Sequence, residues 1–316
     1  MFKSIFYSIL VYVISGVLTV GMAEEVQVTP IKVSEHCYYV QGDSGAASSA
    51  NEGYMSNAGF VITNDGVIVV DSLGTPVLAH KLVDAIRKIT DKPIKRVIVT
   101  HYHADHIYGL QVFKDMGVEI WAHTLGQEYL HSDAAAKLLV EKRESLFPWV
   151  DEKTRLVAAD RWLTADTDFA MGGLHFQLRH VGPAHAPDDM VMFVKEDSVL
   201  YAGDLVFIGR VPFVGDADSL SWLLAIERVL EFNPKFMITG HGTSSKNPVQ
   251  DLVFTRDYLK YIRKVMGKAV EEFVPFDEAY ATADWSQYEH LPAFGDANRL
   301  NTYNTYLLME KESISK

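Results

Sequence analysis

The amino-acid sequence predicts an α/β fold in which two mixed β-sheets pack together with helices on the outside. Three observations lead to this expectation. A hairpin pattern occurs early, apolar strand-like runs mix with segments of helical periodicity, and several runs lead directly into histidine or aspartate. Strands and helices mixed in this way build layered domains, and α/β folds usually place their sites beyond strand ends. We therefore expect a layered domain with a site at one edge of its sheets.

The strand predictions rest on short apolar runs bounded by turn residues. These runs lie at residues 26–33, 37–41, 58–63, 67–71, 96–100, 118–121, 176–180, 190–194, 199–202 and 234–239. The third and fourth runs flank Asn64-Asp65-Gly66, a turn segment whose residues tolerate positive φ. This pattern predicts a β-hairpin.

The helix predictions rest on apolar residues at helical spacing. Such segments lie at residues 75–91, 105–116, 124–147 and 219–232, and from Leu252 onward. Lys92-Pro93 ends the first of them, because proline cannot continue a helix. We interpret the aromatic-rich C-terminal segment as helices packed over the sheets rather than as a cofactor site.

Composition limits the possible functions and suggests the domain layout. The chain has 316 residues, of which 48% are hydrophobic and 22% charged, with a net charge of −12. Such an acidic protein repels nucleic acid and anionic lipid, so the expected partner is a small-molecule substrate. No Pro/Gly/Ser-rich linker divides the sequence. We expect a catalytic domain over residues 24–250 and a helical extension packed on it over residues 251–316, with the oligomeric state left open.

The first 23 residues are typical of a secretory signal peptide. Lys3 precedes an apolar run over residues 5–20, and the small residues that follow end at Ala23, before an acidic pair. The run is shorter than the roughly 20 residues that span a bilayer, which disfavours a retained membrane anchor. We therefore predict cleavage after Ala23, a periplasmic or secreted protein, and no stable membrane span in the mature chain.

The strongest motif is His101-Tyr102-His103-Ala104-Asp105-His106, which follows an apolar strand directly. Four potential metal ligands within six residues are hard to explain as structural groups alone. His101 and His103 are two positions apart on an extended segment, so both rings can point into one cavity. Asp105 and His106 begin the next helix and can face a second centre nearby.

Three later residues share one context, a buried strand leading into a ligand-type residue beside glycine. They are His185, Asp204 and His241. Imidazole and carboxylate ligands suit zinc. The single cysteine, Cys37, excludes both an internal disulfide and a zinc site built on cysteines. We expect one or two zinc ions, with iron as an alternative.

Metals held by these residues would also explain the catalytic chemistry. A zinc ion lowers the pKa of a bound water to roughly 7, which makes a hydroxide nucleophile available at neutral pH. No side-chain nucleophile is then needed, and the sequence has no Gly-x-Ser-x-Gly elbow and no Walker loop. We assign Asp105 a catalytic role in addition to metal binding.

Over residues 58–242 the sequence resembles the metallo-β-lactamase superfamily. The resemblance implies a four-layer αβ/βα sandwich with the site at one edge, followed here by a C-terminal helical extension. It implies a first metal held by His101, His103 and His185. It implies a second metal held by Asp105, His106 and His241. Asp204 would bridge the two metals, and Asp71 matches an acid that supports the ligands in this superfamily.

Two positions indicate which branch of the superfamily the sequence resembles most. Asp204 replaces the cysteine of the best-known antibiotic-degrading branch and looks more like the thioesterase and persulfide dioxygenase branches. Ala186 follows His185 where those branches usually have threonine, which argues against a simple glutathione thioesterase. The stretches 101–109, 182–187, 203–207 and 209–213 look most like the exported SoxH-like or quinoprotein-relay metallohydrolases.

The first hypothesis for function is zinc-dependent hydrolysis of an ester, thioester or amide. The alternatives are oxidation of a persulfide by non-haem iron, β-lactam hydrolysis, and a binding role without turnover. Tyr102, Tyr108 and Arg210 flank the ligands and are candidate substrate contacts, although aromatic packing or a salt bridge explains each of them somewhat better.

Overall fold

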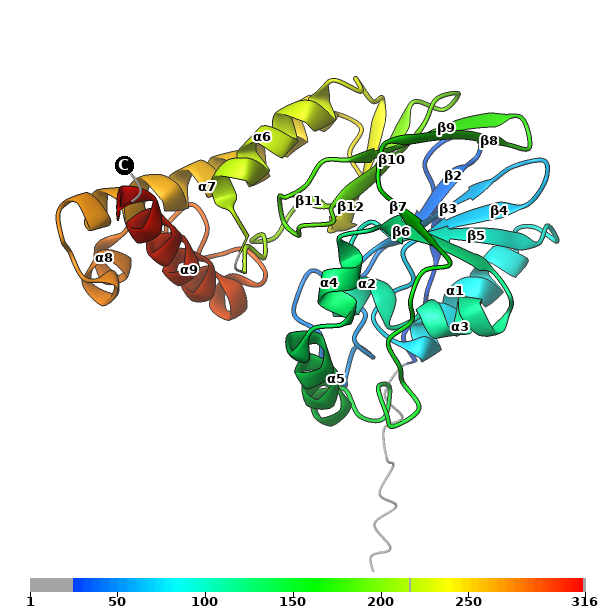
Figure 1. The fold of residues 1–316 in the computed structure, drawn as a ribbon, viewed down its shortest axis with the longest axis horizontal. Coiled ribbons are helices and arrows are strands. Elements are labelled where there is room, and N and C mark those ends of the chain that lie inside the picture. The colour runs from blue at the N-terminus through cyan, green and yellow to red at the C-terminus, as the bar shows by residue number, and fades with distance from the viewer. Residues whose placement is uncertain (1–24, 216, 315–316) are drawn as a thin grey trace, which may run out of the picture.

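Two β-sheets pack face to face in the computed structural model, with helices on both outer sides (Figure 1). The structure describes residues 25–215 and 217–314. The predicted signal peptide over residues 1–23 lies outside the described residues. Among the residues that are described, no helix is both long enough and apolar enough to cross a membrane.

The first sheet has seven strands whose spatial order follows the chain. They are β1 (Pro30–Lys32), β2 (Cys37–Val40), β3 (Ala58–Ile62), β4 (Val67–Val70), β5 (Ile94–Ile98), β6 (Glu119–His123) and β7 (Arg161–Leu163). The strands from β1 to β4 pair antiparallel, including the predicted hairpin, and those from β4 to β7 pair parallel. Helices α1 (Pro76–Arg87) and α3 (Leu110–Asp115) connect the parallel strands and cover the outer face.

The second sheet has five strands in the spatial order β12-β11-β10-β9-β8. They are β8 (Thr167–Met171), β9 (Leu174–His180), β10 (Met190–Val194), β11 (Val199–Phe207) and β12 (Phe236–His241). Only β11 and β12 pair parallel. Helix α6 (Ser219–Leu230) joins them and packs on the outer face together with α7 (Pro248–Glu271).

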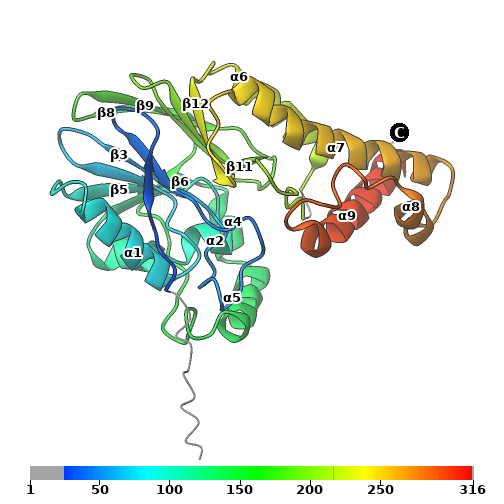
Figure 2. The same ribbon diagram turned by 180° about the vertical axis from the view of Figure 1, so that it is seen from behind.

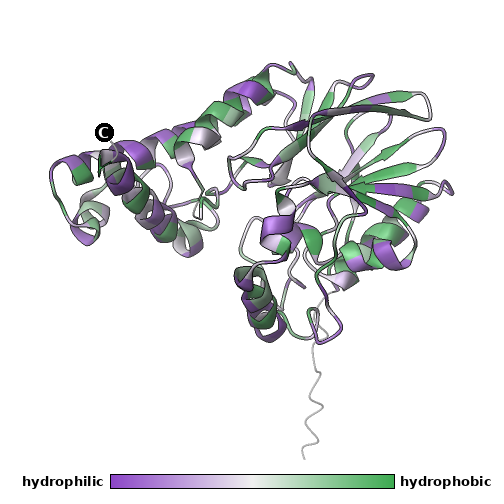
Figure 3. Ribbon diagram, in the orientation of Figure 1, coloured by the Kyte–Doolittle hydropathy of each residue, from purple (hydrophilic) through white to green (hydrophobic). Residues whose placement is uncertain are grey.

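Three layers of buried apolar side chains separate the four structural layers. Strand β4 shows why its sequence is apolar throughout, because both of its faces are buried. Val67 and Val69 face the helices, whereas Ile68 and Val70 face the second sheet. Figure 3 shows the same hydrophobic character along the strands of both sheets. The predicted four-layer αβ/βα sandwich is confirmed.

The structure corrects the prediction of one helix over residues 105–116. The segment forms α2 (Ala104–Ile107) and α3, with a break at Gly109. The Gly109 N–H donates to the carbonyl of Leu73, and a Cβ there would lie 2.0 Å from the carbonyl oxygen of Ser72. This close approach to the chain after β4 ends the first helix at Ile107, directly after the metal motif.

A second expected helix, over residues 124–147, is also divided. It forms α4 (Gly126–Leu130) and α5 (Asp133–Ser145). Ser132 lies between them with an extended backbone, and its hydroxyl accepts a hydrogen bond from the Ala135 N–H. A serine in this position starts a new helix rather than continuing the old one.

The C-terminal helices form an arm that extends from the sandwich (Figures 1 and 2). Helix α7 packs against β11 and α6 and then continues outward, where α8 (Phe276–Thr282) and α9 (Phe294–Ile314) pack on it. Asn301 on α9 accepts a hydrogen bond from the Val214 N–H and donates one to the carbonyl of Pro212. The arm therefore fixes the loop that follows β11.

Candidate metal centre

The first four predicted ligands lie together at the carboxyl end of β5. His101 and His103 occupy the short loop that follows this strand, and Asp105 and His106 lie in α2. The His103 backbone is extended at the start of the helix, so the chain reverses between the two pairs of ligands. The four side chains thus come from the edge of the seven-stranded sheet.

The other three predicted ligands come from the five-stranded sheet. His185 lies in the loop between β9 and β10, Asp204 within β11, and His241 at the end of β12. Each is buried, with 2–4% of its surface exposed. The structure therefore brings all seven predicted ligands to one place, and the two sheets both contribute to it.

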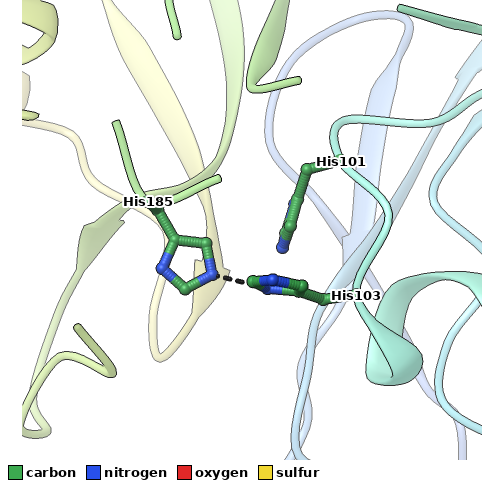
Figure 4. Close-up of side chains that lie close together, drawn as sticks. All are labelled: His101, His103 and His185. Atoms are coloured by element: carbon green, nitrogen blue, oxygen red, sulfur yellow. Dashed lines mark hydrogen bonds between the residues drawn. The ribbon is translucent and has the colours of Figure 1, made fainter. Parts of the chain in front are cut away.

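One group consists of three histidines whose ring nitrogens all lie within 4.8 Å of one another: His101, His103 and His185. The Nδ1 of His103 lies 2.8 Å from the Nε2 of His185, and the His101 ring stands edge-on to both (Figure 4). Convergence of three imidazoles on one point, without a carboxylate among them, is typical of a zinc ligand set.

A second group lies beside the first and comprises Asp105, His106 and His241. The Oδ2 of Asp105 is 3.2 Å from the Nε2 of His241 and 3.5 Å from the Nε2 of His106. This group has the mixed imidazole and carboxylate chemistry that suits zinc or iron.

Asp204 lies between the two groups. Its Oδ1 is 3.2 Å from the Nε2 of His106, while its Oδ2 is 3.2 Å from the Nε2 of His241 and 3.4 Å from the Nε2 of His185. One carboxylate therefore faces ligands of both groups, as expected of a bridging residue.

Unpartnered polar atoms test whether these residues suit a cation. Among the described residues, the Nε2 atoms of His101 and His106 and the Oδ1 of Asp204 are buried and make no hydrogen bond. Buried polar groups are nearly always satisfied, so three such atoms facing one point indicate a missing shared partner. A divalent cation fits this donor set, because imidazole nitrogens and carboxylate oxygens are its usual ligands.

The charge states of the ligands also suit a cation. Burial by itself raises the pKa of a carboxyl group, but the neighbouring His106 and His241 outweigh it, so the pKa values of Asp105 and Asp204 lie below the ordinary range. Burial lowers the pKa of His101 well below its ordinary value and that of His185 to about 3. Asp105 and Asp204 outweigh burial and raise the pKa values of His106 and His241, so these two rings would release a proton when a cation binds. Ionised carboxylates and neutral imidazoles are the forms that bind metals.

Asp71 orients the His101–His106 segment, as the resemblance implied. Its Oδ1 accepts a hydrogen bond from the Thr100 N–H at 2.8 Å. Its Oδ2 accepts one from the Thr100 hydroxyl at 2.8 Å and lies 3.0 Å from the Nδ1 of His106. A carboxylate at Nδ1 fixes the ring so that Nε2 faces the centre.

Backbone carbonyls orient two of the other rings. The Nδ1 of His185 lies 3.0 Å from the carbonyl oxygen of Phe213, and the Nδ1 of His241 lies 2.7 Å from that of Met55. Each carbonyl favours a proton on Nδ1, which leaves Nε2 free to bind a metal. The loop that carries Phe213 is the one fixed by the C-terminal arm.

A pocket of about 310 Å³ opens over this cluster. Five of the seven ligands line it: His103, Asp105, His185, Asp204 and His241. Most of the remaining wall is apolar and comes from Met55, Leu138, Leu146 and Phe213. A pocket of this size has room for a small molecule beside the ligands.

The three candidate substrate contacts differ in position. Tyr108 lines the pocket. Tyr102 does not, because its hydroxyl is buried and donates to the carbonyl of Val157. Arg210 is buried behind the ligands, where its Nη1 donates to the carbonyl of Gly45 and lies 3.3 Å from the Nδ1 of His241. The structure therefore places Tyr108 in the pocket but not Tyr102 or Arg210, for which a structural role was the favoured interpretation.

Two polar pocket residues were not singled out from the sequence. Tyr129 comes from α4 and Lys142 from α5, and both line the pocket. The ring of Tyr129 packs against that of His103, with 6.0 Å between centroids. No local pattern marks these residues, because their place depends on how the two helices pack against the sheet.

Comparison with known proteins agrees with this geometry. The model of the metallo-β-lactamase superfamily matches residues 51–241, which include all seven ligands. The chain belongs to the metallo-β-lactamase superfamily. It is 27% identical over 216 residues to the metallo-β-lactamase type 2 of Bacillus cereus, an alignment that covers 67% of this chain and 75% of that protein.

Alkylsulfatases of the same superfamily are also similar. The linear primary-alkylsulfatase of Pseudomonas sp. is 27% identical over 233 residues, which cover 63% of this chain and 44% of the relative. The solved sec-alkylsulfatase Pisa1 from Pseudomonas sp. superposes with a TM-score of 0.68 at 18% identity, covering 89% of this chain and 50% of that chain. This chain thus spans about half the length of these alkylsulfatases. The relatives are hydrolases, and the predicted class of metallo-β-lactamase-fold hydrolase is confirmed.

Proposed function

We propose that this chain is an exported zinc-dependent hydrolase of a small ester, thioester or amide. One observation carries the proposal. Asp204 lies within 3.4 Å of ligand atoms from two separate groups, and the shared cluster forms the wall of a pocket of substrate size. A purely structural metal site would have no reason to open onto such a pocket.

In the proposed reaction, six residues would each bind one of two zinc ions and Asp204 would contact both. His101, His103 and His185 would hold one zinc ion. Asp105, His106 and His241 would hold another, with Asp204 between the two. Zinc at this place supplies a Lewis acid that lowers the pKa of water to roughly 7 and stabilises negative charge on oxygen. Asp105 lines the pocket, and His106 and His241 hold the pKa of its carboxyl below the ordinary range, so it would accept a hydrogen bond from the reacting water.

The export and subgroup parts of the proposal rest on the sequence. Residues 1–23 have the pattern of a signal peptide, and the stretches around His101, His185, Asp204 and Arg210 resemble the exported SoxH-like or quinoprotein-relay metallohydrolases. Cell fractionation with N-terminal sequencing of the mature protein tests this part. A new N-terminus at Glu24 in the exported fraction supports it, whereas Met1 retained in the membrane fraction contradicts it.

Hydrolysis of a sulfate ester is the second candidate. Its support is the extent of structural similarity to Pisa1, which covers 89% of this chain, compared with the 74% covered by the solved metallo-β-lactamase from Pontibacter korlensis. The superposed part of this chain is longer than the domain over residues 24–250, so it includes part of the helical arm. A sulfate monoester carries anionic oxygens that the same cations would bind, whereas a carboxylic ester develops an oxyanion only during hydrolysis.

Metal analysis and a substrate panel together test these functions. Zinc at one to two per chain, with turnover of an aryl ester, a thioester or an anilide, is the expected result. Turnover of an alkyl sulfate alone would select the second candidate. Iron at one per chain with oxygen uptake on persulfides, or rapid hydrolysis of a chromogenic cephalosporin, would each overturn the proposal. Metal binding without any turnover would favour a binding role.

A further inference from the structure

The pocket has three polar side chains besides the metal ligands. They are Tyr108, Tyr129 and Lys142, and each comes from a different helix or connection outside the two ligand groups. None of them is needed to hold a metal. Their chemistry is therefore available to a substrate.

The two tyrosine hydroxyls have no partner of their own. Tyr108 is 1% exposed, and within the described part of the chain neither its hydroxyl nor that of Tyr129 makes a hydrogen bond. A buried hydroxyl without a partner lowers the stability of the fold, so its presence suggests a role other than stabilisation. Because both residues line the pocket, a bound molecule can supply the acceptor that the protein does not.

Lys142 is a cation without a counterion. It is half-buried on α5, and among the described residues its ammonium group makes no ion pair or hydrogen bond. The adjacent Arg143 differs, because its guanidinium donates to the carbonyls of Asp151 and Thr154 and pairs with Glu152. Of these two neighbouring cations, the one without a protein partner, Lys142, is the one that lines the pocket.

The rest of the cavity suits an apolar body. Met55, Leu138, Leu146 and Phe213 supply hydrophobic walls. A volume of about 310 Å³ corresponds to about ten waters, which is room for one aromatic ring or a short alkyl chain with its functional groups.

We propose that Tyr108, Tyr129 and Lys142 select a small apolar ester that carries a separate anionic group. The tyrosine hydroxyls donate hydrogen bonds to oxygen atoms of the group that is cleaved, and Lys142 pairs with the anion. The inference rests on the proposed hydrolase function and deepens it, because it names the substrate class. The overall charge of −12 repels anions, so this selectivity depends on the local cation.

A matched pair of substrates tests the role of Lys142. On the zinc-loaded enzyme, kcat/KM is measured for phenyl butyrate and for 4-carboxyphenyl butyrate, which differ by one carboxylate. The native enzyme prefers the anionic ester about tenfold, and Lys142→Met removes this preference by raising KM. Lys137→Met, an exposed lysine on the same helix, retains it. A preference that survives in Lys142→Met overturns the assignment.

Removal of each hydroxyl tests the tyrosines. Tyr108→Phe and Tyr129→Phe lower kcat/KM about tenfold for both esters, which is the effect of one lost hydrogen bond. Their melting temperatures stay equal to the native value or rise, because an unpartnered buried hydroxyl has been removed. Tyr303→Phe on the arm is the control. Unchanged kinetics in both variants would show that these hydroxyls are packing groups only.

A binding measurement separates this inference from the proposed function. Calorimetry on the zinc-loaded protein compares benzenesulfonate, which cannot be hydrolysed and binds metals weakly, with the neutral methyl phenyl sulfone. Tighter binding of the sulfonate that is lost in Lys142→Met supports recognition even if no ester is turned over. Ester turnover combined with equal binding of both probes would overturn the recognition proposal and leave the hydrolase proposal standing.

Discussion

A Cβ atom on Gly240 would lie 1.8 Å from the Oδ1 of Asp204, so the carboxylate between the two ligand groups occupies the space of a side chain at residue 240. Gly240 has no unusual backbone angle, and the restriction is therefore one of space. Gly240→Ala is expected to displace Asp204 and to reduce bound zinc to one ion per chain or fewer.

Mass spectrometry of the purified protein measures this zinc content. Gly295→Ala is the matched control, because a Cβ at residue 295 meets nothing within 4 Å. Two zinc ions per chain in Gly240→Ala would show that Asp204 is not needed between the two groups.

The two ligand groups are expected to respond separately to substitution. His185→Ala removes a ligand of the first group alone and His241→Ala a ligand of the second, whereas Asp204→Ala affects both. Zinc titration by calorimetry should show one weakened site in each histidine variant and two weakened sites in Asp204→Ala. Equal loss of both ions in all three variants would contradict the division into two groups.

Asp71→Asn is expected to weaken metal binding without unfolding the protein. Asparagine tolerates the positive φ of residue 71 and can still accept from the Thr100 N–H, but it no longer presents a carboxylate to His106. Loss of such an orienting acceptor typically costs about 10- to 100-fold in metal affinity. Competition with a zinc chelator measures the change. The exposed Asp91→Asn serves as control, and an affinity within twofold of native would exclude a role for Asp71.

His123 is expected to make the fold sensitive to acid. The ring stacks on His180 at 3.7 Å, and burial together with this neighbour lowers its pKa to about 4. The unfolded chain takes up the proton nearer pH 6.5. The neutral His123 therefore makes its full contribution to the free energy of unfolding above about pH 6.5. This contribution, up to about 3 kcal/mol, is lost as the pH falls toward 4.

Urea unfolding at pH 7.5 and 4.5 tests this expectation. His123→Phe keeps the stacked ring but cannot be protonated, so its free energy of unfolding should fall less between the two pH values than that of the native protein. His290→Gln, at an exposed position, should behave as the native protein does. A native and a His123→Phe protein with the same pH dependence would rule out this residue as the cause.

Asn301 is expected to link the arm to the pocket. Asn301→Leu leaves the Val214 N–H and the Pro212 carbonyl without partners, at a cost of roughly 1–3 kcal/mol for each buried group. Phe213, which lies between them and lines the pocket, then loses its fixed position. The melting temperature should fall and KM should rise, with zinc content measured in parallel. Ser313→Ala, on the exposed end of α9, is the control and should change neither the melting temperature nor KM. An unchanged KM in Asn301→Leu would show that the arm does not influence the pocket.

The ligand positions could be predicted from the sequence because each follows or lies in a buried strand. A strand is visible as an apolar run, and strand ends of one sheet meet at one edge. His101, His185 and His241 therefore converge for a reason that is local in each case. Asp71 could be predicted in the same way, since it directly follows β4.

The pocket wall could not be predicted because it depends on contacts between distant segments. Tyr102 lies within the metal motif and Tyr108 just after it, yet Tyr102 points into the protein interior and Tyr108 lines the cavity. Lys142 reaches the cavity only because α5 packs beside it. Strands β7 and β8 were also missed. β7 has only three residues, and β8 is an edge strand that starts with two polar residues and alternates between half-buried and exposed positions.

The ligands come from both sheets, four from the edge of one and three from the edge of the other. An ion bound by both sets is therefore a cross-link between the two halves of the sandwich. Without it, the charges of the buried Asp105 and Asp204 are balanced by the imidazoles themselves, because these carboxylates raise the pKa values of His106 and His241. Metal affinity then contributes to the free energy of folding, so the stability of the native state would rise with the concentration of the metal that the site takes.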